Sequence, residues 1–208
     1  MRTLLITGAT GGLGSEILPL LSASYDCVPM SRHGQGGVKA DLGDPVSVRS
    51  AVQSIAKPLY GLVHLAGGYA PGSIAETSDD TWSSMLALNL TGAFVAIRET
   101  LAVMDRQSPG RIIVIGSEAS LSKAPGNAAY TVSKSGLNTL IEIAAKELRG
   151  SKITANALLP TALDTPAMRG EMPREKLVPL AKVGEALQFL LSDAASHITG
   201  ALIPLRPS

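Results

Sequence analysis

Three side chains that could carry acid–base chemistry lie between positions 117 and 134 of the sequence. Ser117 follows the apolar run Ile112–Ile115, and Tyr130 and Lys134 stand four residues apart in a predicted helix. Residues at that spacing share one helix face, and ligands of open α/β sheets bind beyond the carboxyl ends of the strands, where Ser117 would lie. A free tyrosine has a pKa of about 10, which a neighbouring ammonium lowers. The pattern predicts a cleft in which Tyr130 exchanges a proton and Lys134 lowers the pKa of the Tyr130 phenol.

Each of these residues has a simpler interpretation when it is taken alone. Tyr130 could be an amphipathic surface residue, Lys134 a solvated charge and Ser117 the cap of a strand end. The interpretation as an active site therefore depends on the joint spacing of the three.

A glycine-rich segment follows the first apolar strand and leads directly into a predicted helix. It reads Thr7-Gly8-Ala9-Thr10-Gly11-Gly12-Leu13-Gly14. Glycine permits a sharp turn and the close approach of a phosphate, whose charge free N–H groups and a helix N-terminus would hold. A connection without a ligand is the alternative, but the strand before it and the helix after it favour a dinucleotide loop. The residues expected at the phosphates are Gly8, Thr10, Gly12, Leu13 and Gly14.

Apolar segments of strand length alternate with longer amphipathic segments, which is typical of repeated βαβ units. Strands are expected at residues 2–7, 26–30, 38–41, 60–65, 111–116, 152–158 and 201–205, and helices at 12–24, 45–57, about 80–105, 128–149 and 182–192. Only residues 31–37 separate the second and third strands, too few for a helical crossover, so the helix between strands 2 and 3 is expected to be missing. Residues 1–208 are predicted to form one α/β domain.

The composition limits the partners of this chain. It has 18 basic and 17 acidic residues, which gives no charged surface field for nucleic acid and points to a small molecule. The single cysteine, Cys27, cannot form an internal disulfide, and the first apolar run is too short for a signal peptide, so we expect a cytoplasmic protein. No run approaches the roughly 20 apolar residues of a membrane span. We expect no metal site.

Two spacings in the sequence resemble the motifs of the short-chain dehydrogenase/reductase family. They are T-G-x-x-x-G-x-G at Gly8, Gly12 and Gly14, and S-x(12)-Y-x(3)-K at Ser117, Tyr130 and Lys134. The resemblance implies a Rossmann-like, doubly wound fold with a parallel seven-stranded sheet in the order 3-2-1-4-5-6-7 and helices on both faces. It also implies hydride transfer between a nicotinamide cofactor and a carbonyl or alcohol. Tyr130 would be the general acid or base, Ser117 would polarise the carbonyl, and Lys134 would also hold the nicotinamide ribose.

Further positions match the family's pattern. Asn89, in Leu-Asn-Leu-Thr-Gly, matches the asparagine of N-x-x-G, which implies that it holds a water relaying protons to Lys134. A bond to a neighbouring carbonyl is the alternative. Asp41 and Leu42, which close the third predicted strand, match the position that binds the adenine amino group.

The fourth strand ends where the family has N-N-A-G. Ala66 and Gly67 match and are expected at the cofactor, whereas His64 and Leu65 replace the two asparagines. By the resemblance this asparagine braces the central sheet. His64 is interpreted as a core histidine without a catalytic role.

The segment after the sixth strand matches the family's P-G-x-x-x-T in part. Pro160 and Thr165 match and are implied to lie near the nicotinamide carboxamide, while Thr161 replaces the glycine and leaves the path of the loop open. Residues from about 163 to 180 are interpreted as a mobile apolar lid, with an ordinary surface loop as the alternative.

The choice of cofactor depends on the end of the second strand, where an acidic residue would accept the ribose 2′-hydroxyl and an arginine would suit a 2′-phosphate. This chain has Ser31 and Arg32 there. A hydroxyl and a guanidinium favour phosphate, so NADP(H) is expected ahead of NAD(H), which stays possible. A solvated loop arginine is the alternative.

Several features resemble the dihydropteridine reductase branch of the family, including the short chain, the missing helix and Tyr69 after Ala66-Gly67-Gly68. Those enzymes generally lack the active-site serine and carry an acidic residue for NADH, whereas this chain has Ser117 and Arg32. A carbonyl or ketoacyl-type reductase is thus the first hypothesis and a pterin reductase the second. A third is a sensor that binds NADP(H) without turnover.

The family commonly forms dimers and tetramers through two long helices, which here are the predicted helices at about 80–105 and 128–149. Both carry small residues, including Ala93, Ala96, Ala144 and Ala145, that would suit close helix packing. The same residues would suit packing on the sheet. A homodimer or homotetramer is the expectation.

Overall fold

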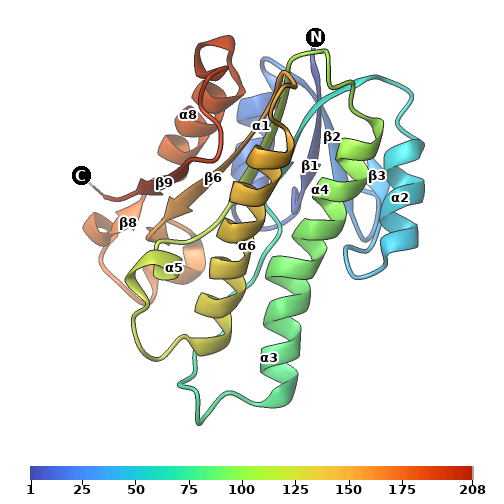
Figure 1. Cartoon of the computed structure of the whole chain (residues 1–208). Coiled ribbons are helices and arrows are strands. Elements are labelled where there is room, and N and C mark those ends of the chain that lie inside the picture. Colours follow the sequence, from blue (N-terminus) through green and yellow to red (C-terminus); the bar gives the residue numbers. More distant parts are fainter. Residues whose placement is uncertain (208) are drawn as a thin grey trace.

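A seven-stranded parallel sheet forms the centre of the protein, in a computed structural model that describes residues 1–207 (Figure 1). Its order, β3-β2-β1-β4-β5-β6-β9, confirms the predicted topology. The inner strands are apolar runs that are buried on both faces, as parallel strands under helices must be. The strands are β1 (Thr3–Thr7), β2 (Asp26–Ser31), β3 (Val38–Lys39), β4 (Leu59–His64), β5 (Gly110–Ile115), β6 (Ile153–Pro160) and β9 (Leu202–Leu205).

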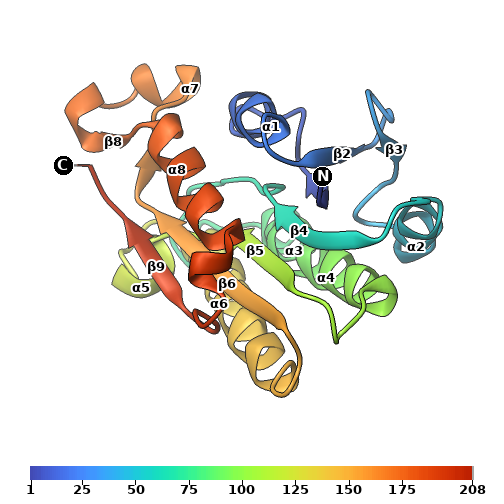
Figure 2. The ribbon, with the colours of Figure 1, turned by 90° about the horizontal axis from the view of Figure 1, so that it is seen from above.

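Helices cover both faces of the sheet, and side chains alternate between two hydrophobic cores. Along β4, Leu62 faces one core and Val63 the other. Viewed from above, α1 and α8 lie on one side of the sheet and α4 and α6 on the other (Figure 2). The helices are α1 (Gly14–Ser22), α2 (Pro45–Gln53), α3 (Asp79–Leu86), α4 (Gly92–Val103), α5 (Ala119–Ser122), α6 (Ala128–Glu147), α7 (Pro166–Arg169) and α8 (Leu180–Leu191).

The connection between β2 and β3 has no helix, as predicted. The chain turns at residues 32–37 and returns to the sheet, where the amide of Ala40 donates to the carbonyl of Ser31. The turn is tight, because a Cβ on Gly37 would lie 2.0 Å from the carbonyl oxygen of Pro29. β3 is shorter than the predicted 38–41, since only Val38 and Lys39 pair with β2.

The helix predicted at about 80–105 is interrupted by one π-helical stretch, η1 (Ala87–Thr91), between α3 and α4. Such bulges occur frequently at functional sites, and Asn89 lies in this one. The whole segment, Asp79–Val103, is long and apolar enough to cross a bilayer, with a mean hydropathy of 1.4 in its most apolar window. This amends the expectation from the sequence. The segment nevertheless packs as a core helix, because Ala93 and Ala96 are buried against the sheet.

The segment after β6 is folded rather than an open loop. A two-stranded ladder joins β7 (Ala162–Leu163) to β8 (Leu177–Val178), with α7 and the short 3-10 turn η2 (Arg174–Lys176) between them. A second 3-10 turn, η3 (Asp193–Ala195), follows α8. The carboxylate of Asp164 accepts from Arg169 at 2.5 Å. The predicted apolar lid is therefore held by a ladder and an ion pair.

Candidate active site

The glycine loop between β1 and α1 has a shape that only glycine permits. Gly8 has a φ of +70°, and a Cβ on it would lie 2.5 Å from the backbone nitrogen of Ala66. A Cβ on Gly14 would lie 2.1 Å from the carbonyl oxygen of Gly8. The first turn of α1 thus rests directly on the end of β1, and the loop rests on the chain leaving β4.

The loop presents unused amide groups at its open side. The amide of Gly11 donates to Gly8 and that of Ser15 to Gly11, whereas the amides of Gly12 and Leu13 have no hydrogen-bond partner within residues 1–207. Gly12 is exposed, and a Cβ on it would meet nothing nearer than the methyl of Thr165, at 3.9 Å. Free N–H groups at a helix N-terminus with open space before them fit a pyrophosphate.

Two further loops meet this one at the carboxyl edge of the sheet. Gly8 lies against Ala66, in the loop that follows β4. Gly12 lies near Thr165, in the segment that follows β6. Pro160 ends β6, and its carbonyl accepts from the amide of Glu118 at 3.0 Å, which ties this segment to the residue after Ser117.

The expected adenosine side is formed by the ends of β2 and β3. The hydroxyl of Ser31 accepts from the amide of Gln35 at 3.3 Å, and Arg32 is exposed. One carboxylate oxygen of Asp41 accepts from the amide of Gly43 at 2.9 Å, so it orders its own turn. Leu42 lies against the start of α4, where a Cβ on Gly92 would be 3.2 Å from it.

Ser117 and Tyr130 meet directly, although they come from different elements. Ser117 follows β5 and is almost fully buried, and Tyr130 lies in the first turn of α6. Burial raises the pKa of Tyr130, and the neighbouring Ser117 side chain opposes that increase. The Ser117 hydroxyl also accepts from the amide of Ala119 at 3.2 Å. At neutral pH the Tyr130 phenol is therefore protonated.

Lys134 is buried one helical turn further along α6. Its Nζ donates to the carbonyl of Ile115 at 2.9 Å, and burial lowers its pKa to about 8. The groups that shift the pKa of Tyr130 are Ser117 and Tyr69, not Lys134. The expected lowering of the Tyr130 pKa by Lys134 is therefore not seen in the protein alone.

Asn89 braces the loop that follows β4 through both polar atoms of its amide. Its Oδ1 accepts from the amide of Gly68 at 2.8 Å, and its Nδ2 donates to the Gly68 carbonyl at 3.0 Å. The same nitrogen donates to the hydroxyl of Ser133 at 3.1 Å. Ser133 was not identified from the sequence, because nothing in the chain signals a pairing across that distance. A Cβ on Gly67 would lie 3.0 Å from Asn89 Oδ1 and 3.1 Å from Lys134 Nζ, so both atoms face one point.

Tyr69 covers the open side of Tyr130. The two rings meet edge to face with centroids 5.1 Å apart, and 61% of Tyr69 is exposed. Its hydroxyl donates to Oδ1 of Asn127 at 2.8 Å. Tyr69 is thus oriented from its far end, by a residue that the sequence did not single out.

The family model described as short chain dehydrogenase matches residues 29–176, which is more than half of the chain. The chain belongs to this family. It is an NAD(P)-dependent oxidoreductase of the short-chain dehydrogenase type.

Relatives align with 81% to 98% of this short-chain dehydrogenase. The chain is 30% identical to the 3-oxoacyl-[acyl-carrier-protein] reductase MabA of Mycobacterium tuberculosis, over 98% of this chain and 91% of that protein. It is 33% identical to an NADPH-dependent aldehyde reductase-like chloroplastic protein of Arabidopsis thaliana, over 81% and 69% of the two chains. A crystal structure of an actinorhodin polyketide ketoreductase variant with NADPH has the same fold, with a TM-score of 0.90, 23% identity and coverage of 99% and 96%.

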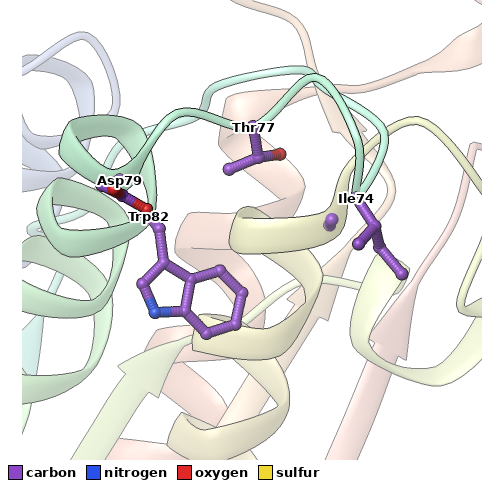
Figure 3. A pocket seen from close by; sticks show the side chains of 5 residues that line it. Ile74, Thr77, Asp79 and Trp82 are labelled. Carbon is purple, nitrogen blue, oxygen red and sulfur yellow. The ribbon is translucent and has the colours of Figure 1, made fainter.

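A surface hollow of about 240 Å³ lies beside the candidate site of this dehydrogenase rather than over its polar residues. Figure 3 shows the ring of Trp82 and the side chain of Ile74 on opposite sides of it. Ala128, two residues before Tyr130, is also part of its lining. The lining residues are Ile74, Thr77, Asp79, Trp82 and Ala128.

His64, the last residue of β4, is fully buried in this enzyme. Its Nδ1 shares a hydrogen bond with the hydroxyl of Thr7 at 2.8 Å, and its Nε2 has no partner within residues 1–207. Burial, with a further contribution from the charge of Lys134, lowers its pKa to about 3, so the ring is neutral. No group of three or more His, Cys, Asp or Glu side chains gathers as a metal site among the described residues.

Proposed function

We propose that this enzyme is an NADPH-dependent reductase of carbonyl compounds, of the general carbonyl or 3-oxoacyl type, with Tyr130 as the proton donor. The observation that carries the proposal is the placement of the Ser117 side chain beside the Tyr130 phenol, where it lowers the pKa of that phenol and brings the start of α6 to the end of β5. That pair lies at the edge of the sheet where the glycine loop offers free amides for a pyrophosphate. A hydride donor and a proton donor would thereby flank one carbonyl.

The roles of the side chains follow from their surroundings. Because burial raises the pKa of Tyr130, its phenol stays protonated at neutral pH and can donate to the carbonyl oxygen as reduction proceeds. Ser117 would orient that oxygen through a hydrogen bond donated by its hydroxyl. Bound NADPH supplies the hydride to the carbonyl carbon. Lys134 would bind the nicotinamide ribose and supply the positive charge that stabilises the Tyr130 phenolate after transfer.

Tyr130→Phe tests this assignment, because it removes the phenolic hydroxyl that would donate the proton and keeps the ring. Turnover of a panel of diketones, quinones and quinonoid pterins by NADPH should fall at least about a hundredfold, while NADPH binding stays nearly unchanged. Tyr25→Phe, distant from the site, is the matched control. Parental turnover in the Tyr130 variant would place the proton donor elsewhere, and no turnover by the parent with any ketone would favour the sensor hypothesis.

NADP(H) is the proposed cofactor, with NAD(H) as the weaker alternative. Arg32 follows β2, is exposed and forms no ion pair among residues 1–207, so it is free to meet a 2′-phosphate. One relative is named an NADPH-dependent aldehyde reductase-like protein. Arg32→Ala should raise the KM for NADPH roughly tenfold and leave that for NADH unchanged. Arg106→Ala, on another exposed loop, is the control, and unchanged NADPH affinity in the Arg32 variant would reject the assignment.

The likeness to MabA supports a 3-oxoacyl or similar carbonyl substrate. A pterin-like substrate is the second candidate, and the position of Tyr69 edge-on to Tyr130 is the observation that favours it, since an exposed ring there can stack on a flat heterocycle. Reduction of quinonoid dihydropteridine faster than of any 3-oxoacyl thioester would reverse this order.

We further propose that residues 1–208 form one cofactor-binding domain, that the enzyme acts in the cytoplasm, and that it assembles as a homodimer or homotetramer. Ala93, Ala96, Ala144 and Ala145 are buried in the core and cannot make an interface, contrary to one of the two possibilities left open from the sequence. Larger apolar side chains are exposed on the same helices instead: Leu88, Phe94, Val132 and Ile143. Sedimentation of the parent and of Phe94→Asp tests this assembly.

A further inference from the structure

His64 is the one departure from the family's strand-end motif that brings a new functional group into the interior. The Asn-to-His difference matters because the imidazole is fully buried and only one of its two nitrogens is bonded. Buried polar atoms are nearly always paired, with protein or with water. An unpaired Nε2 at the end of β4 therefore calls for a partner in the space that it faces.

That space lies on the same face of the sheet as α6 and η1. Leu62 of β4 and Leu5 of β1 belong to the core covered by these helices, so two residues further along each strand His64 and Thr7 point the same way. Just beyond His64, Asn89 Oδ1 and Lys134 Nζ converge on one point beside Gly67. The imidazole of His64 thus lies beneath Asn89 and Lys134.

The charged and titratable groups around His64 are few. β1 contributes Thr7, β5 contributes Val114 and η1 contributes Asn89, none of which is charged. α6 contributes Lys134, whose charge is the one that acts on His64, and Tyr130 on the same helix face. The other buried charges, Glu99 and Arg111, are engaged elsewhere, with Arg49 and Arg98 and with the carbonyls of Gly110 and Ser192.

We propose that His64 is a positioning residue for Lys134: as the Nδ1–H tautomer it donates to Thr7, and its Nε2 accepts, through one buried water, a hydrogen bond from the Lys134 ammonium. This inference rests on the proposed role of Lys134 at the Tyr130 site. The tautomer follows from electrostatics, because an ammonium nearby favours a lone pair over a second N–H at Nε2. A water needs two or more polar partners in a polar site, and Nε2, Lys134 Nζ and Asn89 Oδ1 offer three.

The consequence is that His64 keeps Lys134 charged against the cost of its burial. Without an acceptor behind it, a buried ammonium loses its proton more readily. In the family's pattern an asparagine stands at this position, and its shorter side chain can keep the bond to Thr7 but offers no atom where Nε2 lies. The histidine therefore extends the hydrogen-bonded chain from Lys134 back to the first residue of the glycine segment, Thr7.

Two variants test the roles of Nδ1 and Nε2 of His64 separately. His64→Asn retains a polar atom near Nδ1 and removes Nε2, whereas His64→Gln places an amide near Nε2. In protein labelled with ¹³C at lysine Cε, with Lys134→Arg to assign the signal, the pKa of Lys134 should fall by about half to one unit in His64→Asn, a threefold to tenfold weaker hold on the proton. In His64→Gln the fall should be smaller. Equal pKa values in the parent and His64→Asn, or equal falls in both variants, would overturn the proposal.

A second measurement needs no variant to fold. Nitrogen-15 NMR of the imidazoles in the parent protein distinguishes the tautomers, and the chain has only three histidines to assign. The Nδ1–H form at neutral pH is expected for His64, and an Nε2–H form would overturn the inference. Both readouts are independent of turnover, so they can fail while Tyr130→Phe still abolishes reduction, and they can succeed if Tyr130→Phe retains it.

The pH dependence of catalysis tests whether His64 also affects Tyr130. The pH profile of kcat/KM for oxidation of the best alcohol should move to higher pH in His64→Asn, because a less stable ammonium stabilises the Tyr130 phenolate less. The KM for NADPH should stay within twofold of the parent, and thermal midpoints of the two variants should be alike. A profile unmoved in His64→Asn with a lowered Lys134 pKa would overturn the link to Tyr130.

Discussion

The glycine loop and the cluster around Lys134 both lie at the carboxyl edge of the sheet but work by different means. The loop acts through backbone: its amides are free, and its shape depends on the absence of side chains at Gly8 and Gly14. The cluster acts through buried side chains whose protonation depends on the surroundings, as with Lys134 at a pKa of about 8 and His64 at about 3. A backbone site fails when atoms are added, and a buried polar site fails when atoms are removed or exchanged.

The largest expected effect is at the loop, from the addition of one methyl group. Gly14→Ala would place a Cβ 2.1 Å from the carbonyl oxygen of Gly8, so α1 must move away from the end of β1. Binding of NADPH, measured by fluorescence titration, should weaken more than about a hundredfold, since the amides lose their common focus.

Gly43→Ala adds the same methyl group beside the expected adenosine position, where its Cβ meets only Asp41 Oδ1 at 3.4 Å, so it should weaken NADPH binding far less than Gly14→Ala. If Gly14→Ala is folded by circular dichroism and binds NADPH like the parent, the loop is not the phosphate site, and the contrast between the two regions is lost.

The next effect is at the cluster, from removal of a charge. Lys134→Ala should lower turnover about a hundredfold and also raise the KM for NADPH, because one side chain serves both the phenolate and the ribose. Steady-state kinetics with both cofactor and ketone varied measure the two effects. A loss of turnover with an unchanged KM for NADPH would contradict the double role.

The burial of Lys134 also predicts how the stability of the protein depends on pH. Because burial lowers the pKa of Lys134 from 10.5 to about 8, the native state holds its proton less tightly than the unfolded chain. Between pH 8 and 10.5 the unfolded state binds more protons, so the parent gains stability as pH rises. Lys134→Met should therefore exceed the parent in thermal midpoint below pH 8, by an amount that shrinks toward pH 10.5. A constant difference across this range would show that the ammonium is not the cause.

The smallest expected effect is at Tyr69, which belongs to neither region and borders the open side. If its ring stacks on the substrate, Tyr69→Ala should raise the KM for planar ring substrates roughly threefold to fifteenfold and spare small aliphatic ketones. Tyr69→Phe keeps the ring and removes only the bond to Asn127, so it should resemble the parent. Equal losses for both substrate classes would assign Tyr69 to shielding rather than stacking.

The sequence by itself determined the architecture and family of this protein. The positions of the strands, the missing helix between β2 and β3 and the placement of Ser117 before α6 follow from local patterns, because buried parallel strands, glycine turns and i,i+4 pairs depend on residues close in the chain. The strand order was implied by the resemblance to the family. The spacing of Tyr130 and Lys134 is one such pattern.

What only the tertiary structure decided is the state of the polar groups. Asn89 lies in a π-helical turn and bonds Gly68 and Ser133, which are distant in sequence. The segment predicted as an apolar lid is closed by the pairing of β7 with β8, and the alanines of the long helices pack on the sheet rather than on a partner. His64 looked like a satisfied core residue, yet one nitrogen is unpaired. Burial and hydrogen bonding are sums over contacts from many elements, so they have no local signature, and the pKa values that govern the chemistry depend on them.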